Sequence, residues 1–241
     1  MQPELKPIPT NERSPGRGSA PYTSDVVSAG AQKVLRNTYL LLALTMVPTV
    51  IGAWIGMQTA GIIMASPFVS MIVLLAGVIG LQFAIARYRN SGVGVALLLL
   101  MTGMLGWWLG PLLNVALSMS NGMQLVAYAA VGTGAIFLTM GVIASTTKRD
   151  FSFMGKFLFV GMIALLVAML ANMWLQIPAL ALTISTLVIV VFSLFLLYDL
   201  QRIIRGGETN YVMATTGVYL SLFNIFANLL HLLMALAGER D

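Results

Sequence analysis

The sequence predicts an all-α integral membrane protein with seven transmembrane helices. Hydrophobic residues make up 59% of the 241 residues and charged residues only 9%, with a mean hydropathy of +0.91. A soluble domain carries nearer a quarter charged residues, so lipid is the solvent that suits this composition. Seven windows of about 20 mostly apolar residues are each long enough to span a bilayer. Basic residues cluster in alternate loops, as expected of a multi-pass protein.

Residues 1–32 differ in composition from the rest of the chain. They are rich in Pro, Ser, Gly and mixed charge. Such a segment cannot bury enough apolar area to offset its ordering entropy, so we predict a flexible tail followed by a membrane domain over 33–241. Because the first thirty residues lack an apolar core, we expect no cleavable signal peptide. The first hydrophobic helix then serves as the targeting signal.

The apolar windows follow one another with short connections. The last window carries recurrent polar groups, so it is either a full crossing or a re-entrant segment. We expect a full crossing, because the C-terminal tail carries little positive charge. The windows cover roughly residues 37–57, 67–87, 93–113, 123–145, 155–175, 179–199 and 212–236.

Two pairs of glycines and three prolines lie in or beside these windows. Gly52 and Gly56 are four residues apart, as are Gly106 and Gly110. Small residues at this spacing let helix backbones approach closely in lipid. Prolines in or beside spans are expected to kink or end helices. These prolines are Pro48, Pro111 and Pro178.

The distribution of Lys and Arg predicts the orientation. The loops near 58–66, 114–122 and 176–178 contain none, and every basic residue except Arg240 falls on the other side. By the positive-inside rule the N-terminus is cytoplasmic, and seven spans place the C-terminus in the periplasm. The net charge of +5 and pI near 9.7 therefore indicate topology, without a nucleic-acid partner. A basic patch beside a membrane also attracts anionic lipid.

Asp199 is the one acidic residue at the end of an apolar window. It either lies at headgroup level, solvated or paired with Arg202 three residues on, or it has a functional role inside the membrane. Arg202 and Arg205 are candidates for ion pairs on the cytoplasmic side. The sequence leaves both interpretations of Asp199 open.

The last window carries a polar stripe. Its residues are three, four and three positions apart, which places them on one face of a helix. A polar stripe in a lipid-embedded helix faces protein or water, since unpaired amides in hydrocarbon are penalised. It provides hydrogen bonds between helices or lines a path that Asp199 guards. The stripe consists of Ser221, Asn224, Asn228 and His231.

Several kinds of catalytic and metal site lack support. The chain has no cysteine and one histidine, His231, so thiolate chemistry and histidine metal sites are not expected. No H-E-x-x-H or G-x-S-x-G motif lies in the spans. An intramembrane aspartyl protease needs two carboxylates sharing a proton, and no second acid lies inside a span. We therefore expect no enzyme and no cofactor.

Short motifs along residues 33–241 resemble the Bax inhibitor family of transmembrane proteins. G-G-E-T-N-Y at 206–211 is the most specific of them. The seven spans, the L-Y-D-L-Q-R-I-I stretch and the polar last helix agree with this resemblance. The other motifs are K-V-L-R-N-T-Y at 33–39, L-G-P-L-L-N at 109–114, K-R-D-F-S-F at 148–153, L-Q-I-P-A-L at 175–180 and Y-L-S-L-F-N-I-F at 219–226.

The resemblance implies a Bax-inhibitor-like bundle and two possible activities. Members of the wider family are proposed to use an aspartate on each of the last two helices as a pH-sensitive latch for calcium leak. Asp199 matches the first aspartate, whereas Ser221 stands where the second is expected, so coupled titration of a pair is not carried over. A calcium site built from Asp199, Ser221 and Asn224 would be weak.

The bacterial branch of the family implies a different role. It implies an inner-membrane protein that binds the FtsH protease with its HflKC assembly and restrains it. A tail of about thirty residues suits this role, because an ATP-driven protease needs an unstructured handle. We therefore predict a regulator that modulates FtsH. The alternatives are a pH-sensitive calcium or proton leak channel and a structural partner protein with neither activity.

Overall fold

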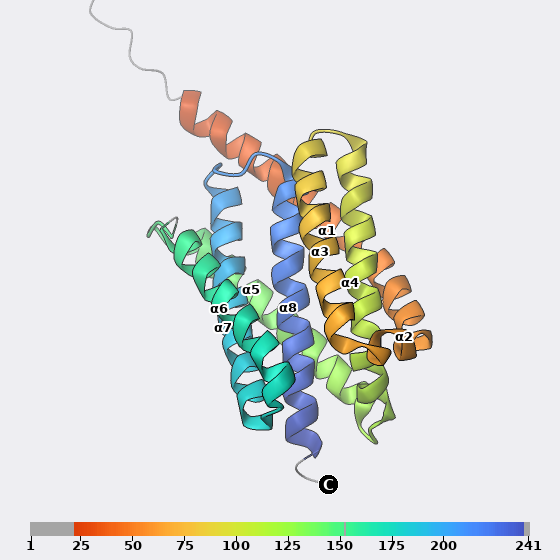
Figure 1. Cartoon of the computed structure of the whole chain (residues 1–241). Coiled ribbons are helices and arrows are strands. Elements are labelled where there is room, and N and C mark those ends of the chain that lie inside the picture. The colour runs from red at the N-terminus through yellow and green to blue at the C-terminus, as the bar shows by residue number, and fades with distance from the viewer. Residues whose placement is uncertain (1–21, 152, 239–241) are drawn as a thin grey trace, which may run out of the picture.

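The computed structural model describes residues 22–151 and 153–238, and these form a bundle of long helices (Figure 1). Within those residues it contains no strand, which confirms the all-α prediction. The helices are α1 (Tyr22–Gln58), α2 (Ala60–Ala65), α3 (Pro67–Tyr88), α4 (Gly92–Ser118), α5 (Gly122–Thr146), α6 (Met154–Leu175), α7 (Pro178–Ile204) and α8 (Tyr211–Gly238).

Seven of the described helices are long and apolar enough to cross a membrane, and they coincide with the seven predicted windows. α8 is continuous over 28 residues, so the last window is a full-length helix and not a broken, re-entrant segment. The predicted loop at 58–66 contains a short additional helix, α2. Its six residues are too few to span a bilayer, so α2 links α1 to α3 at one end of the bundle.

Part of the predicted tail is helical. Residues 1–21 lie outside the described part of the chain, but α1 begins at Tyr22, so residues 22–32 are helical. Once the span beyond residue 33 has nucleated a helix, each further residue adds one hydrogen bond at little cost. Composition alone misses this extension, because the stretch is neither apolar nor periodic enough to look like a span.

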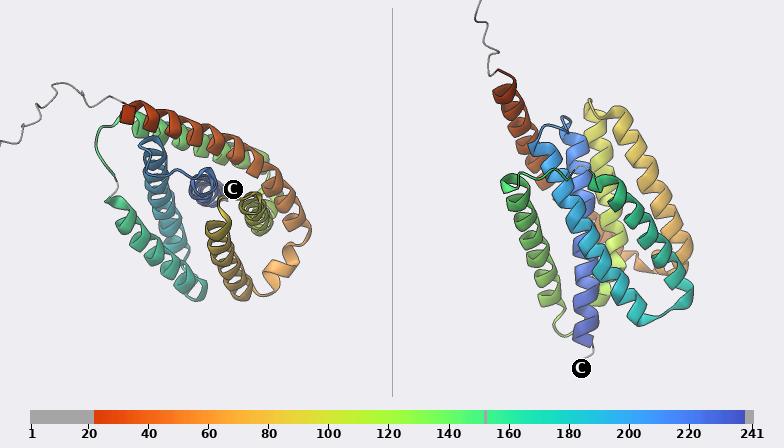
Figure 2. Two further views of the ribbon diagram at one scale, coloured as in Figure 1. Left: turned by 90° about the horizontal axis from the view of Figure 1, so that it is seen from above. Right: turned by 90° about the vertical axis from the view of Figure 1, so that its left-hand side faces the viewer.

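The last helix occupies the centre of the bundle. Seen end-on in Figure 2, α8 lies among the other helices, and it packs against α1, α3, α4, α5 and α7. α6 lies at the periphery and packs against α7. A helix surrounded by others can carry polar groups wherever its neighbours supply hydrogen-bond partners.

The predicted glycine pairs form the crossing of α1 and α4. A Cβ atom on Gly52 would collide with the carbonyl of Gly103, and one on Gly106 with the carbonyl of Thr49. The two backbones therefore touch, and only glycine fits at these positions. This tight crossing aligns the C-terminal half of α1 along α4.

Pro111 contributes to the same crossing. It lies inside α4 and has no N–H, so the carbonyl of Trp107 four residues earlier lacks its helical donor. Gly56 of α1 lies directly against that carbonyl, where a side chain would collide with it. The amide of Asn114 also donates to the carbonyl of Met57 at 2.7 Å, so the end of α1 is fastened to α4.

The loops that carry Lys and Arg meet at one end of the bundle. The α3–α4 and α7–α8 connections lie together in Figure 1, and the C-terminal end of α8 lies at the opposite end. Hydrogen bonds join the residues of three such loops, at Arg89, Arg149 and Asn210. We call this the basic end. It brings together in space the charges that the sequence assigned to one side of the membrane.

Candidate functional site

The basic end of α7 carries the candidate site. α7 runs to Ile204, five residues beyond Asp199, and then closes with a glycine turn. Gly206 has a φ of 74°, in the left-handed region that glycine adopts without strain. The N–H of Gly207 donates to the carbonyl of Arg202 at 2.8 Å. The G-G pair therefore ends α7 and turns the chain toward α8.

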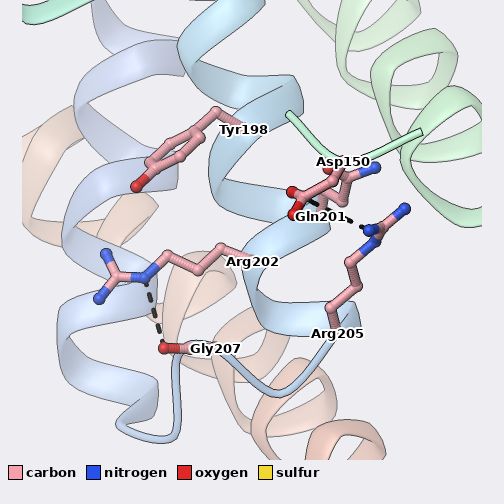
Figure 3. Close-up of a pocket in the computed structure, with 6 residues that line it drawn as sticks. All are labelled: Asp150, Tyr198, Gln201, Arg202, Arg205 and Gly207. Carbon is pink, nitrogen blue, oxygen red and sulfur yellow. Dashed lines mark hydrogen bonds and ion pairs between the residues drawn. The ribbon is translucent and has the colours of Figure 1, made fainter. Parts of the chain in front are cut away.

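A pocket of about 230 Å³ lies beside this turn (Figure 3). Both of its arginines are engaged by the protein. Arg202 pairs with Glu208 at 3.0 Å, and its Nε donates to the carbonyl of Gly207 at 3.4 Å. Arg205 lies 3.9 Å from a carboxylate oxygen of Asp150. The lining residues are Asp150, Tyr198, Gln201, Arg202, Arg205 and Gly207.

Gln201 and Arg205 fasten the α5–α6 connection to α7. The buried Gln201 side chain accepts from the N–H of Phe151 and donates to the carbonyl of Arg149, both at 2.8 Å. Arg205 donates to the carbonyls of Lys148 at 2.9 Å and Arg149 at 2.7 Å. These bonds satisfy backbone groups of the α5–α6 connection, whose described residues have no regular secondary structure to pair them.

Asn210 fastens a third loop to the same place. Its side-chain oxygen accepts from the N–H groups of Val212 and Met213, so Asn210 caps the start of α8. Its amide nitrogen donates to the carbonyl of Arg89 at 3.0 Å and to the side chain of Asn90 at 2.8 Å. The G-G-E-T-N-Y segment thus joins α7, α8 and the α3–α4 turn into one unit.

Asp199 faces α8 and not the loops. Its carboxylate lies against Gly217, where an added Cβ would be 2.7 Å from Oδ2. Arg202 pairs with Glu208, so the predicted alternative of an Asp199–Arg202 ion pair is not formed. Among the residues that the structure describes, none donates a hydrogen bond to this partly buried carboxylate. The absence of a side chain on Gly217 makes room for it.

The predicted polar stripe is satisfied mostly within α8. The amide of Asn224 donates to the carbonyl of Leu220, and that of Asn228 to the carbonyl of Asn224, both at 2.9 Å. His231 Nδ1 lies 3.0 Å from the hydroxyl of Ser185 on α7. One interhelical bond thus ties α8 to α7 at the end remote from Asp199. In the part of the chain described, no three acidic or histidine side chains are grouped as metal ligands.

Comparison with known proteins identifies the family. Residues 31–238 match the family described as Inhibitor of apoptosis-promoting Bax1. The chain belongs to the Bax inhibitor family. It is 41% identical over 201 residues to a protein of Escherichia coli K12 named Modulator of FtsH protease YccA, covering 83% of this chain and 89% of that relative.

Other bacterial relatives match over similar lengths. A protein of Escherichia coli O6:H1 named Inner membrane protein YccA is 41% identical, with 83% of this chain and 89% of the relative covered. A protein of Neisseria meningitidis serogroup A is 38% identical over 221 residues, covering 90% of this chain and 96% of its own. With its seven apolar helices, the chain is therefore a multi-pass inner-membrane protein.

Ser221, a member of the predicted polar stripe, is buried with 2% of its surface exposed. It lies one helical turn after Gly217, the residue that contacts Asp199. The α8 surface opposite Asp199 thus offers a glycine and a hydroxyl. In this pair of helices, Asp199 has no carboxylate partner.

Sequence reasoning missed Tyr219, which connects three helices. Its hydroxyl lies 2.7 Å from the hydroxyl of Thr49 on α1 and donates to the carbonyl of Thr102 on α4 at 3.3 Å. The ring is buried, with 2% of the residue exposed. A tyrosine within a polar last helix was the available signal, because a buried hydroxyl needs a partner. Gln201 and Asn210 were quoted within family motifs, but their loop contacts had no sequence signal.

Proposed function

We propose that this protein is an inner-membrane regulator that binds the FtsH protease and inhibits its proteolysis. The observation that carries the proposal is the 41% identity to YccA, a protein named as a modulator of FtsH, over 83% of this chain. The regulator acts by contact and not by chemistry of its own, and no catalytic group enters the proposal.

The basic end supports this role. Gln201, Arg205 and Asn210 hold three loops in one arrangement, so the protein presents a preformed surface at that end of the bundle. A preformed surface loses little entropy on binding. We propose that this end is cytoplasmic and the C-terminus periplasmic, in accord with the positive-inside rule. The tail before Tyr22 provides the handle that the protease engages, with HflKC as part of the same assembly.

Reconstitution with purified FtsH tests the proposal. FtsH and a membrane substrate are placed in liposomes with the full chain, with a chain lacking residues 1–21, or with a chain whose tail is scrambled at constant composition. We expect slower substrate degradation with the full chain and a weaker effect after deletion. The scrambled tail restores the effect if composition alone matters. Unchanged degradation with the full chain, together with no crosslink to FtsH in native membranes, would contradict the proposal.

A leak channel for calcium or protons is the second candidate. Its support is the Asp199 carboxylate, which is partly buried between α7 and α8 against Gly217 without a hydrogen-bond donor. Such a group inside a membrane marks a functional site in many transporters. Flux of calcium or protons into liposomes is compared between the native protein and Asp199→Asn. Equal flux for both proteins, or none for either, removes this candidate.

A structural partner protein without either activity is separated by the same preparations. Affinity purification from native membranes would then recover partners other than FtsH, and neither degradation nor ion flux would respond to the protein.

A further inference from the structure

An apolar cavity lies between α1, α4, α5 and α8. Its volume is about 620 Å³, and its walls are almost entirely apolar. It lies in the half of the bundle away from the basic end, lined by residues within 46–57 of α1, 126–137 of α5 and 219–226 of α8. This cavity is separate from the pocket beside Arg202 and plays no part in the proposed contacts with the protease.

The cavity opens toward lipid between α1 and α5. α1 and α5 meet where the rings of Tyr39 and Phe137 pack edge to face with centroids 5.9 Å apart. Beyond that contact, the cavity separates the two helices. Val50 and Trp54 line it and are 67% and 61% exposed on the outer surface of α1. Since both helices are spans, this opening faces the hydrocarbon of the bilayer.

The polar groups that line the cavity already have hydrogen-bond partners within the protein. The hydroxyl of Thr49 has two partners at 2.7 Å, the carbonyl of Thr45 and the hydroxyl of Tyr219, and its single proton is donated to one of them. The hydroxyl of Thr133 donates to the carbonyl of Ala129 at 2.7 Å. A water molecule or an ion would find few free partners here, because apolar cavities stay dry. An apolar occupant fits the walls better than a polar one.

We propose that this cavity holds one acyl chain of a bilayer phospholipid, which enters between α1 and α5. The volume falls within the range of about 300–1,000 Å³ of pockets that enclose single small ligands. A partner helix is too large, because three turns of a helix about 10 Å across occupy on the order of 1,300 Å³. The bilayer supplies acyl chains at the opening in every state of the protein. The methyl end of the acyl chain lies against the rings of Phe223 and Tyr219.

Two glycines of α5 provide a matched test. Gly134 lines the cavity and Gly141 does not, and an added Cβ meets no atom within 4 Å at either position. Both belong to the same helix, so Gly134→Phe and Gly141→Phe change helix propensity alike. Phenylalanine at 134 fills the cavity, whereas phenylalanine at 141 leaves it open. Ala130→Phe, also at the cavity wall, is a second blocking variant.

The full-length protein is reconstituted in nanodiscs with phosphatidylethanolamine that carries a diazirine in one acyl chain. After irradiation, labelled peptides are mapped by mass spectrometry. We expect labelling within 46–57 and 126–137 of the native protein to exceed that of the lipid-facing helices α3 and α6. This excess is lost in Gly134→Phe and Ala130→Phe and kept in Gly141→Phe.

Two results would overturn the proposal. One is labelling spread evenly over all spans of the native protein, or an excess that persists in both blocking variants. The other is a crosslink from this cavity to a partner protein in native membranes in place of lipid. Neither result depends on whether FtsH is inhibited, so this inference and the proposed function fail independently.

Discussion

The hydroxyl of Tyr219 on α8 and the hydroxyl of Thr49 on α1 lie 2.7 Å apart at the inner wall of the apolar cavity. Tyr219 also reaches a carbonyl of α4. One buried side chain thus links the central helix to both members of the tight α1–α4 pair. In hydrocarbon, such a bond orients helices that apolar contact alone would leave free to rotate.

Tyr219→Phe is expected to destabilise the bundle modestly. The change removes the contacts of the tyrosine hydroxyl with Thr49 and with the carbonyl of Thr102, while Thr49 can still donate to the carbonyl of Thr45. We expect a loss of about 1 kcal/mol in the free energy of unfolding. Denaturation in mixed micelles measures it. Tyr128→Phe is the control, since Tyr128 is 60% exposed. An equal loss in both variants would contradict a special role for Tyr219.

Gly56→Ala is expected to disrupt the α1–α4 crossing. The new methyl group would collide with the carbonyl of Trp107, so the two backbones have to separate. Overpacking of this kind costs about 1–3 kcal/mol. Thermal unfolding in detergent is compared with Gly80→Ala on α3, where an added Cβ meets no atom within 4 Å. A stable Gly56→Ala protein would show that the crossing is looser than described.

Gly217→Ala is expected to act through Asp199. The methyl group would lie 2.7 Å from Oδ2, so the carboxylate must move away from α8. We expect Gly217→Ala to destabilise the protein less when Asp199 is already alanine, with a coupling energy of about 0.5–3 kcal/mol. A double-mutant cycle on unfolding in micelles measures it. Strictly additive effects would mean that the two residues do not contact each other.

Gln201→Leu is expected to loosen the α5–α6 connection. The variant leaves the N–H of Phe151 without its partner, whereas the carbonyl of Arg149 keeps the hydrogen bond from Arg205. Leaving buried groups unpaired costs about 1–3 kcal/mol. Hydrogen exchange of the 147–151 segment should accelerate, because the loop opens more often. Gln124→Leu, at an exposed position on α5, serves as the control. Unchanged hydrogen exchange at 147–151 would show that Gln201 does not hold the α5–α6 connection against α7.

Much of the fold could be predicted because span length and charge placement are local properties. The apolar windows predicted the seven spanning helices, and the glycine pairs predicted a close crossing that proved to be α1 against α4. Family motifs predicted membership of the Bax inhibitor family, which the comparisons confirm. Composition did not reveal that α1 begins at Tyr22, because a helix can extend past its apolar part without a signal in composition.

The candidate site was predicted less completely. Asp199 was singled out because it was the only acid at a span. Its neighbour Gly217 has no functional group by which the sequence could mark it as part of the site. The polar stripe was found by spacing, yet Asn224 and Asn228 turn back onto their own helix. Spacing shows that side chains share a face. It does not show whether a carbonyl of the same helix is their partner.

By itself, the sequence determined that the protein lies in lipid, how many spans it has and which loops carry the basic residues. Each of these depends on runs of residues along the chain. Only the tertiary structure decided that α8 is central, that Tyr219 bonds Thr49, and that Asp199 lies against Gly217. In lipid, all faces of an apolar helix are solvated almost equally well. Hydrophobic periodicity therefore carries little information about which face of each helix turns toward its neighbours. Close packing and a few hydrogen bonds determine the orientation of each helix instead.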